Sequence, residues 1–97
     1  FLVSAPEGGA TVLGRSEGTS PELAALVNGA LAHALDFDDV SHTMGGHPTI
    51  PVLMAALGLA EERGSTGGDV LRAYCVGVEI ETAIGRGVNF THYDKGW

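Results

Sequence analysis

The segment from residue 33 to residue 49, HALDFDDVSHTMGGHPT, is the part of this 97-residue chain that is richest in ionisable side chains. It contains three carboxylates and three imidazoles, which are Asp36, Asp38, Asp39, His33, His42 and His47. A nearby carboxylate stabilises the protonated form of an imidazole, and small changes of pKa carry a histidine across neutral pH. General acid–base catalysis uses groups of this kind. The sequence therefore predicts that any functional site lies in this segment.

Two simpler interpretations of the same side chains remain open. The segment is equally consistent with an acidic turn in contact with solvent and, with much less support, with a loop whose oxygens and imidazoles bind a metal ion. Neither the DxDxDG pattern of a calcium loop nor an HExxH motif occurs, so we predict no metal and no other cofactor. His33 is expected to be a packed or hydrogen-bonded histidine rather than a ligand.

Three helices are expected to position this segment. Ser20, Pro21 and Glu22 are typical of a helix start, and the first helix should end near residues 36–39, which would place His33 and Asp36 on one face. A second helix is predicted from residue 50 or 51 to residue 63, with Gly64 as its stop. A third should begin after residue 65 or 66 and end near residue 87. Residues 10–13 favour a loop or a single edge strand, and residues 88–97 an irregular tail.

These elements predict an all-α fold with three main helices that is part of a larger helical domain. Residues 51–60 are apolar on nearly all sides, and residues 70–84 carry a broad apolar stripe. Three helices cannot bury so much apolar surface among themselves. We therefore expect the chain to be a fragment of a longer protein, or to associate with a partner.

Charge and composition exclude several classes of function. The formal net charge is −7, and the five Lys and Arg residues are scattered, so a nucleic-acid or anionic-membrane surface is not expected. No apolar stretch is long enough to span a bilayer. The only cysteine, Cys75, excludes an internal disulfide and fits a reducing, cytoplasmic location. No glycine-rich phosphate-binding motif is present.

Four stretches of the sequence together resemble the MmgE/PrpD family: AALVNGALAHALDFDDV, GGHPT, PVLMAALGLAEERGSTGGDVLRAYCVGVEIETAIGR and NFTHYDKGW. Members of this family include 2-methylcitrate dehydratase, cis-aconitate decarboxylase and iminodisuccinate epimerase. The resemblance implies that residues 1–97 are a partial N-terminal helical domain, with a glycine-rich lead-in at 1–19, a helical segment at 20–97 and an active-site loop at 36–49. It also implies a homodimeric enzyme with a further α/β domain.

The resemblance assigns roles to particular residues. In the family, the first Asp of DFDD and the His of HP line the active site, which implies catalytic roles for Asp36 and His47. Asp39 and His42 are expected to bind substrate. Family members often have Thr directly after DFDD, where this chain has Val40, so a hydroxyl contact is lost or supplied elsewhere.

The implied function is a lyase or isomerase that acts on a small polycarboxylate, as in the acid–base elimination of a 2-methylcitrate dehydratase. A polyanionic substrate beside three aspartates needs cations, and this chain supplies few. The remainder of the enzyme or a partner subunit should provide them, so the chain alone is expected to be inactive. The alternatives are a helical interaction or oligomerisation module without catalysis and, with less support, a metal-binding helical module.

Overall fold

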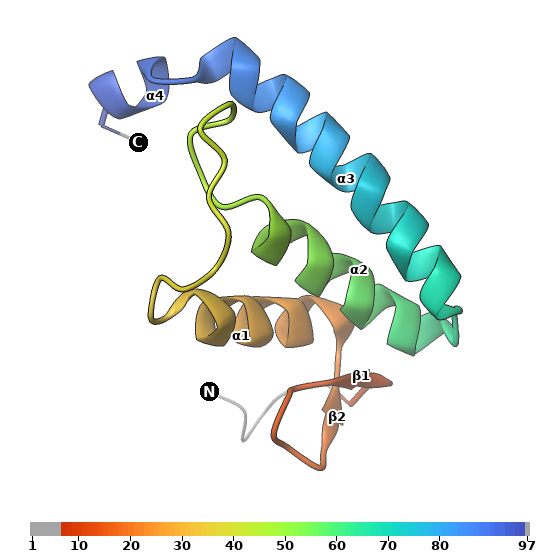
Figure 1. Cartoon of the computed structure of the whole chain (residues 1–97). Helices are drawn as coiled ribbons and strands as arrows, with labels where there is room; N and C mark the ends of the chain where they lie inside the picture. The colour runs from red at the N-terminus through yellow and green to blue at the C-terminus, as the bar shows by residue number, and fades with distance from the viewer. Residues whose placement is uncertain (1–6, 97) are drawn as a thin grey trace.

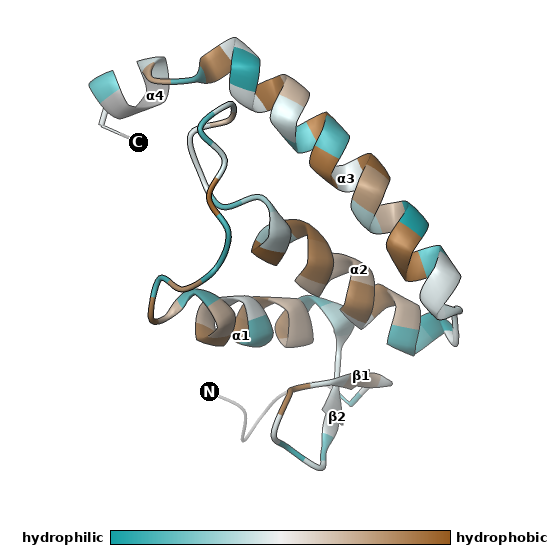
Figure 2. Ribbon diagram, viewed as in Figure 1, coloured by the Kyte–Doolittle hydropathy of each residue, from teal (hydrophilic) through white to brown (hydrophobic). Residues whose placement is uncertain are grey.

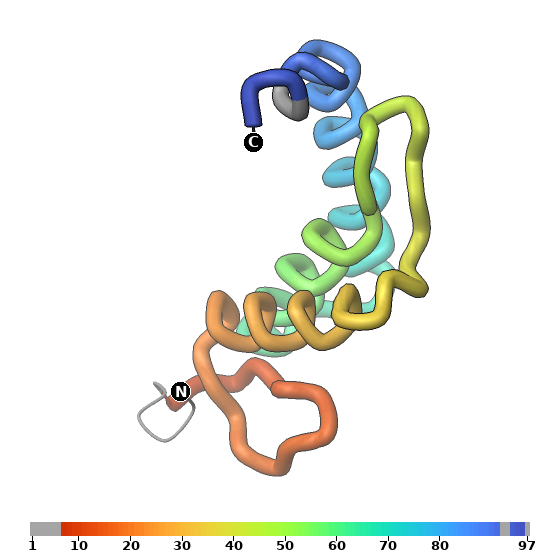
Figure 3. Tube along the Cα trace, turned by 90° about the vertical axis from the view of Figure 1, so that its left-hand side faces the viewer, coloured from red at the N-terminus to blue at the C-terminus, as the bar shows by residue number. Residues whose placement is uncertain are grey.

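A computed structural model describes residues 7–96, apart from the side chains of residues 92 and 93. In chain order the elements are β1 (Ala10–Thr11), β2 (Gly18–Thr19), α1 (Pro21–His33), α2 (Thr49–Arg63), α3 (Gly67–Val88) and α4 (Thr91–Asp94). The hairpin lies below α1 and α2, and α3 runs along α2 and past its start (Figure 1). The loop between α1 and α2 extends toward the C-terminal end of α3, so the chain forms an open arc in side view (Figure 3).

The prediction of an all-α fold is wrong in one respect, because the lead-in folds as a small antiparallel hairpin. Ala10 pairs with Thr19 and Thr11 pairs with Gly18. The partner strand was not predicted because Gly-Thr carries no strand signal of its own, so the predicted single edge strand or loop is a paired strand. The fold is predominantly helical with one two-stranded sheet. Residues 1–6 of the predicted lead-in and residue 97 of the tail lie outside the described range.

Side chains of α1 and α2 hold the hairpin against these two helices. The buried Asn28 of α1 donates from Nδ2 to the carbonyl of Thr11 (2.8 Å) and accepts from the amide of Leu13 (2.9 Å). Glu61 and Glu62 at the end of α2 accept from hairpin amides. A buried amide side chain that satisfies two backbone groups explains how so short a sheet is held in place.

Helix α1 begins where its sequence predicts and ends earlier. Ser20 is the N-cap, and its hydroxyl accepts from the amide of Leu23. The helix stops at His33, not near residues 36–39, and Asp36 adopts a left-handed conformation with φ 56°. Carboxylates are unfavourable at the negative end of a helix dipole, and Asp tolerates this backbone conformation better than most residues. His33 and Asp36 therefore do not share a helix face.

The other helix ends follow their local signals. Gly64 ends α2 with φ 62°, and Thr66 begins α3 with a capping box to Asp69, as the sequence predicts. Helix α2 starts at Thr49, one or two residues before the predicted start. The predicted irregular tail contains one helical turn, α4.

Close packing of α1 on α2 depends on Gly58, which is buried at their crossing. A Cβ at this position would lie 2.9 Å from the carbonyl oxygen of Pro21, which is backbone and cannot move aside. The crossing therefore brings the start of α1 against the middle of α2. This contact fixes the angle at which both helices lead into the site loop.

Few large side chains are buried in the part of the chain that the structure describes. The buried apolar residues are Ala10, Val12 and Ala24, whereas many large apolar residues are exposed. Figure 2 shows hydrophobic residues along α1 and α3, and the exposed ones include several on these two helices. On α3 these include Val76, Ile80 and Ile84, each more than half exposed. The expectation that the helices carry more apolar surface than they bury together is confirmed for these residues. None of the described helices combines the length and hydropathy needed to cross a membrane.

Candidate active site

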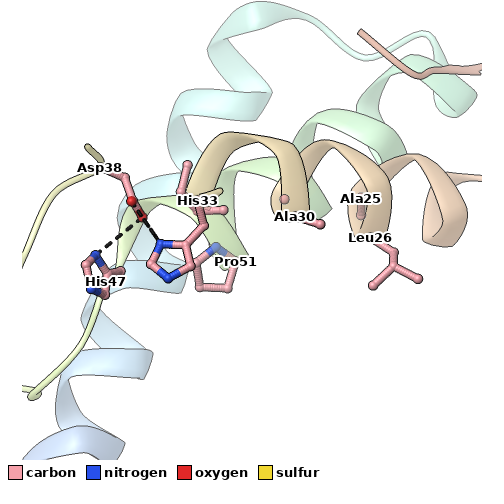
Figure 4. A pocket seen from close by; sticks show the side chains of 9 residues that line it. Ala25, Leu26, Ala30, His33, Asp38, His47 and Pro51 are labelled. Atoms are coloured by element: carbon pink, nitrogen blue, oxygen red, sulfur yellow. Dashed lines mark hydrogen bonds and ion pairs between the residues drawn. The ribbon is translucent and has the colours of Figure 1, made fainter. Parts of the chain in front are cut away.

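Asp38 lies between two imidazoles where the site loop leaves α1. Its Oδ1 is 2.9 Å from Nδ1 of His33, and its Oδ2 is 3.4 Å from Nδ1 of His47 (Figure 4). Only 6% of the Asp38 side chain is exposed. The two imidazole rings meet edge to face, with centroids 4.6 Å apart. One carboxylate thus connects the end of α1 to the residue before Pro48.

Asp36 faces the other nitrogen of His47. Its Oδ1 is 3.5 Å from His47 Nε2, and its side chain is 76% exposed. The left-handed backbone at Asp36 turns the chain so that Asp36 and Asp38 approach one imidazole from two sides. The two residues to which the family resemblance gives catalytic roles therefore lie together, with Asp38 as a third member.

His47 is held at ion-pair distances rather than by short hydrogen bonds. Its Nδ1 is buried without a hydrogen-bond partner among the described residues. Catalytic hydrogen bonds are often long in a free enzyme and shorten when substrate is bound. The distances at His47 are therefore compatible with those of a free enzyme.

A shallow pocket of about 430 Å³ opens beside these groups. Its polar end is formed by His33, Asp38 and His47, and the rest of its lining is apolar: Ala25, Leu26, Gly29, Ala30, Ile50 and Pro51. Apolar walls with a few convergent polar groups are usual for small-molecule sites. Neither lysine nor arginine is among these lining residues.

The other two predicted site residues lie differently. Asp39 is hydrogen-bonded to Thr49. Its Oδ1 accepts from the Thr49 amide (3.2 Å) and its Oδ2 accepts from the Thr49 hydroxyl (2.7 Å). His42 is exposed in the turn that closes with the Ser41–Gly46 bridge. It is not part of the cluster formed by His33, Asp36, Asp38 and His47.

The C-terminal end of α3 and Asn89, the residue that follows it, support this turn. Asn89 donates from Nδ2 to the carbonyl oxygens of His42 (3.4 Å) and Thr43 (3.2 Å). Gly85 is buried against Met44, where a Cβ would lie 2.5 Å from Met44 Cβ. The site loop is therefore fixed at both ends by α1 and α2, and in its middle by α3.

The contact between His33 and Asp38 changes the pKa of both groups. The hydrogen bond to Asp38, and then its negative charge, raises the pKa of His33 above 6.5. The same hydrogen bond lowers the pKa of Asp38 below 3.8. The pair therefore favours a protonated imidazole beside an ionised carboxylate.

These shifts predict how stability depends on pH. The contribution of His33 is complete below its unfolded pKa of 6.5 and is lost as pH rises through its higher folded pKa. The contribution of Asp38 is complete above 3.8 and is lost as pH falls through its lower folded pKa. His33→Gln should therefore lower the free energy of unfolding most between pH 3.8 and pH 6.5, as measured by urea unfolding across pH. A loss that is uniform up to pH 10 would contradict the assignment.

Among the residues that the structure describes, the same four side chains form a set that could hold a metal ion. Their donor atoms lie within 4.8 Å of one another. Donors around a tetrahedral Zn²⁺ are about 3.3 Å apart, as follows from metal–ligand distances near 2.0–2.1 Å. The set fits a divalent cation only after rotation of the side chains. Each imidazole lies at ion-pair distance from a carboxylate, and the absence of a metal remains a prediction.

The sequence did not single out several residues that the structure brings to the site. Asp38 was one of three equivalent aspartates, and its central position depends on the end of α1 and the turn at Asp36. Tyr74 of α3, whose hydroxyl lies 2.8 Å from Thr49 Oγ1, and Asn89, the residue directly after α3, are far away in sequence, and no local pattern marks them. His33 was predicted to be packed or hydrogen-bonded; it is hydrogen-bonded, and its side chain is half exposed.

Comparisons with known proteins identify two relatives of this chain. Cis-aconitate decarboxylase of Homo sapiens is 42% identical over 65 residues, which cover 63% of this chain and 13% of that protein. Cis-aconitate decarboxylase of Mus musculus is 37% identical over 90 residues, which cover 88% of this chain and 18% of that protein. The chain thus spans less than a fifth of the length of these relatives. No solved structure shows significant similarity.

The family comparison covers nearly the whole chain. Residues 3–97 match the model of the MmgE/PrpD N-terminal domain. This range contains the hairpin, the three long helices and all four residues of the His–Asp cluster. The chain belongs to the MmgE/PrpD family.

Proposed function

We propose that this chain forms one wall of the active site of a cytoplasmic lyase or isomerase that acts on a small polycarboxylate. The observation that carries this proposal is the position of His47, whose two ring nitrogens face Asp38 and Asp36 at the polar end of the pocket. Membership of a family with lyase relatives supports the same class of reaction.

The proposed reaction is an acid–base elimination of the 2-methylcitrate dehydratase type. A base removes a proton from carbon, the electron pair forms the carbon–carbon double bond, and the hydroxyl leaves as water after it receives a proton from an acid. His47 is one member of this pair. Asp38 orients the ring through Nδ1, and Asp36 is exposed enough to move from Nε2 when substrate enters.

Decarboxylation of cis-aconitate, the activity for which the two relatives are named, is the alternative within the same class. There, loss of CO₂ leaves an electron pair on carbon that takes up a proton from an acid. An imidazole that exchanges one proton with carbon serves both reactions. The geometry of His47 therefore supports the class of reaction more directly than it supports one substrate.

The negative charge of the described site implies that other parts of the enzyme help to bind the substrate. Asp38 lines the pocket, and Asp36 lies 3.5 Å from His47, which also lines it. Neither Lys nor Arg is among the lining residues, although a polycarboxylate needs positive charge to bind. We infer that cationic groups come from the rest of the enzyme or from a second subunit of a homo-oligomer. The 97-residue chain alone is then inactive.

The test is turnover by the intact protein that contains this chain. Purified protein is incubated separately with 2-methylcitrate and cis-aconitate, and products are followed by proton NMR in D₂O, which also records deuterium incorporation at carbon. Dehydration or decarboxylation of one of them is expected. The absence of turnover and of deuterium exchange with both would contradict the proposal.

An interaction module without catalysis is the second candidate. It is favoured by the exposed apolar stripe of Val76, Ile80 and Ile84 on α3. Exposed apolar surface of this kind marks association with further protein. Stable association of the protein without turnover in the assay above would favour this candidate.

A further inference from the structure

We infer that Asp39, Thr49 and Tyr74 act as a positioning unit that fixes His47 for proton transfer, and that Asp39 therefore acts through Thr49 rather than by contacting substrate. This inference rests on the proposed function of the same site. It is carried by a chain of hydrogen bonds that joins the site loop, the start of α2 and the middle of α3.

The first backbone amides of α2 need a hydrogen-bond acceptor from outside the helix. Pro48 occupies the N-cap position and has no side-chain acceptor for the first amides of the helix. Asp39 supplies the missing acceptor from ten residues away, since its Oδ1 accepts from the Thr49 amide at 3.2 Å. A carboxylate is also favourable at the positive end of a helix dipole. Asp39 thus acts as a remote cap for α2.

The direction of the hydrogen bonds follows from the donors available. The carboxylate of Asp39 accepts only, so the single hydroxyl hydrogen of Thr49 is donated to Oδ2 at 2.7 Å. Thr49 Oγ1 then acts as acceptor toward Tyr74, whose hydroxyl lies 2.8 Å away and must donate. The order is Tyr74 to Thr49 to Asp39. Hydrogen bonds linked in this way strengthen one another, most of all when they end on a charge.

The positions of Asp39 and Thr49 in the sequence explain how their hydrogen bonds control the imidazole of His47. Asp39 directly follows Asp38, and Thr49 lies two residues after His47, separated from it only by Pro48. Joining Asp39 to Thr49 closes the site loop and sets the 3.4 Å separation between Asp38 Oδ2 and His47 Nδ1. Proline restricts the backbone between the joined residue and the histidine. A displacement of about 1 Å at a reacting group is enough to lower a rate about 100-fold.

A second carboxyl group, that of Glu81 on α3, has a pKa that responds to Asp39. Burial, and then the negative charge of Asp39, raises the pKa of Glu81, whose Oε2 is buried without a hydrogen-bond partner among the described residues. Glu81 lies two helical turns after Tyr74 on α3. The Glu81 carboxyl group is therefore biased toward its neutral form.

The test compares three variants of the intact enzyme. Thr49→Val keeps the shape of the side chain and removes the hydroxyl, and it should lower kcat about 10- to 100-fold with little change in KM. Tyr74→Phe should lower kcat in the same direction by a smaller factor. Thr49→Ser restores the hydroxyl and should restore most of kcat. Thr43→Val makes the same chemical change in the same loop, at an exposed side chain, and should leave kcat within about twofold of the parent.

A second readout separates positioning from stability and does not depend on turnover. In protein labelled with ¹⁵N-histidine, the ring signals of His47 should differ in chemical shift and titration midpoint between Thr49→Val and the parent, and not between Thr43→Val and the parent. Unchanged kcat and unchanged His47 signals in Thr49→Val would overturn the inference. If the parent turns over neither polycarboxylate, the proposed function fails, and the His47 signals still decide whether the positioning unit exists.

Discussion

His47→Gln is expected to lower kcat of the intact enzyme by about 10²- to 10⁴-fold, the usual loss when a general acid or base is removed. Glutamine is close to histidine in size and offers an amide in place of a group that exchanges protons near neutral pH. KM should change much less, because His47 is only one of several groups that line the pocket. Steady-state kinetics with the substrate identified in the turnover assay, at several pH values, measures both quantities.

The comparison variant for His47 is Asp38→Asn. It retains the ring but replaces the buried carboxylate that faces Nδ1 with a neutral amide. Its kcat should fall less than that of His47→Gln, and its pH–rate profile should move, because the charge beside the imidazole has been removed. Retention of more than half of the parent kcat by folded His47→Gln would contradict the assignment of His47 to the reaction.

Gly85→Ala is expected to destabilise the protein by about 1–3 kcal/mol, the typical cost of forcing an additional group into packed structure. The added Cβ would lie 2.5 Å from Met44 Cβ and 2.8 Å from Met44 Cα, so the site loop has to move away from α3. Activity should fall as well, because Met44 lies three residues before His47 in that loop. Thermal unfolding and kcat are the two measurements.

Gly87→Ala is the matched control for this prediction. It lies in the same helix, and a Cβ there meets nothing within 4 Å. Alanine has the higher helix propensity, so this variant should be as stable as the parent or more so. If the two variants unfold at the same temperature and have the same kcat, the contact between Gly85 and Met44 does not hold the loop.

Four of the six ends of the long helices were predictable because their sequence signals are local. Ser20, Gly64 and the Thr66–Asp69 capping box each satisfy backbone groups within four residues of themselves. Such contacts form in almost any tertiary environment. The starts of α1 and α3 and the ends of α2 and α3 were therefore predicted to within about one residue.

The early end of α1 and the hairpin were not predictable in this way. Helical periodicity continues to Leu35, and nothing local indicates that the chain turns at Asp36. The turn is accompanied by contacts of Asp38 and Asp39 with residues that follow a long loop. The partner strand at Gly18–Thr19 likewise pairs with residues seven or nine positions earlier, beside α1 and α2.

The sequence by itself determined the family, the helical character and the segment that carries the site, because these follow from residue types and short spacings. It also singled out Asp36 and His47, through their resemblance to a family motif. Only the tertiary structure decided how the three aspartates differ: Asp36 is exposed beside Nε2, Asp38 is buried between two imidazoles, and Asp39 is bound to Thr49. The physical reason is that the exposure and the contacts of each carboxylate depend on the group beside it. The turn after α1 and the packing of α2 and α3 bring these groups to the three aspartates.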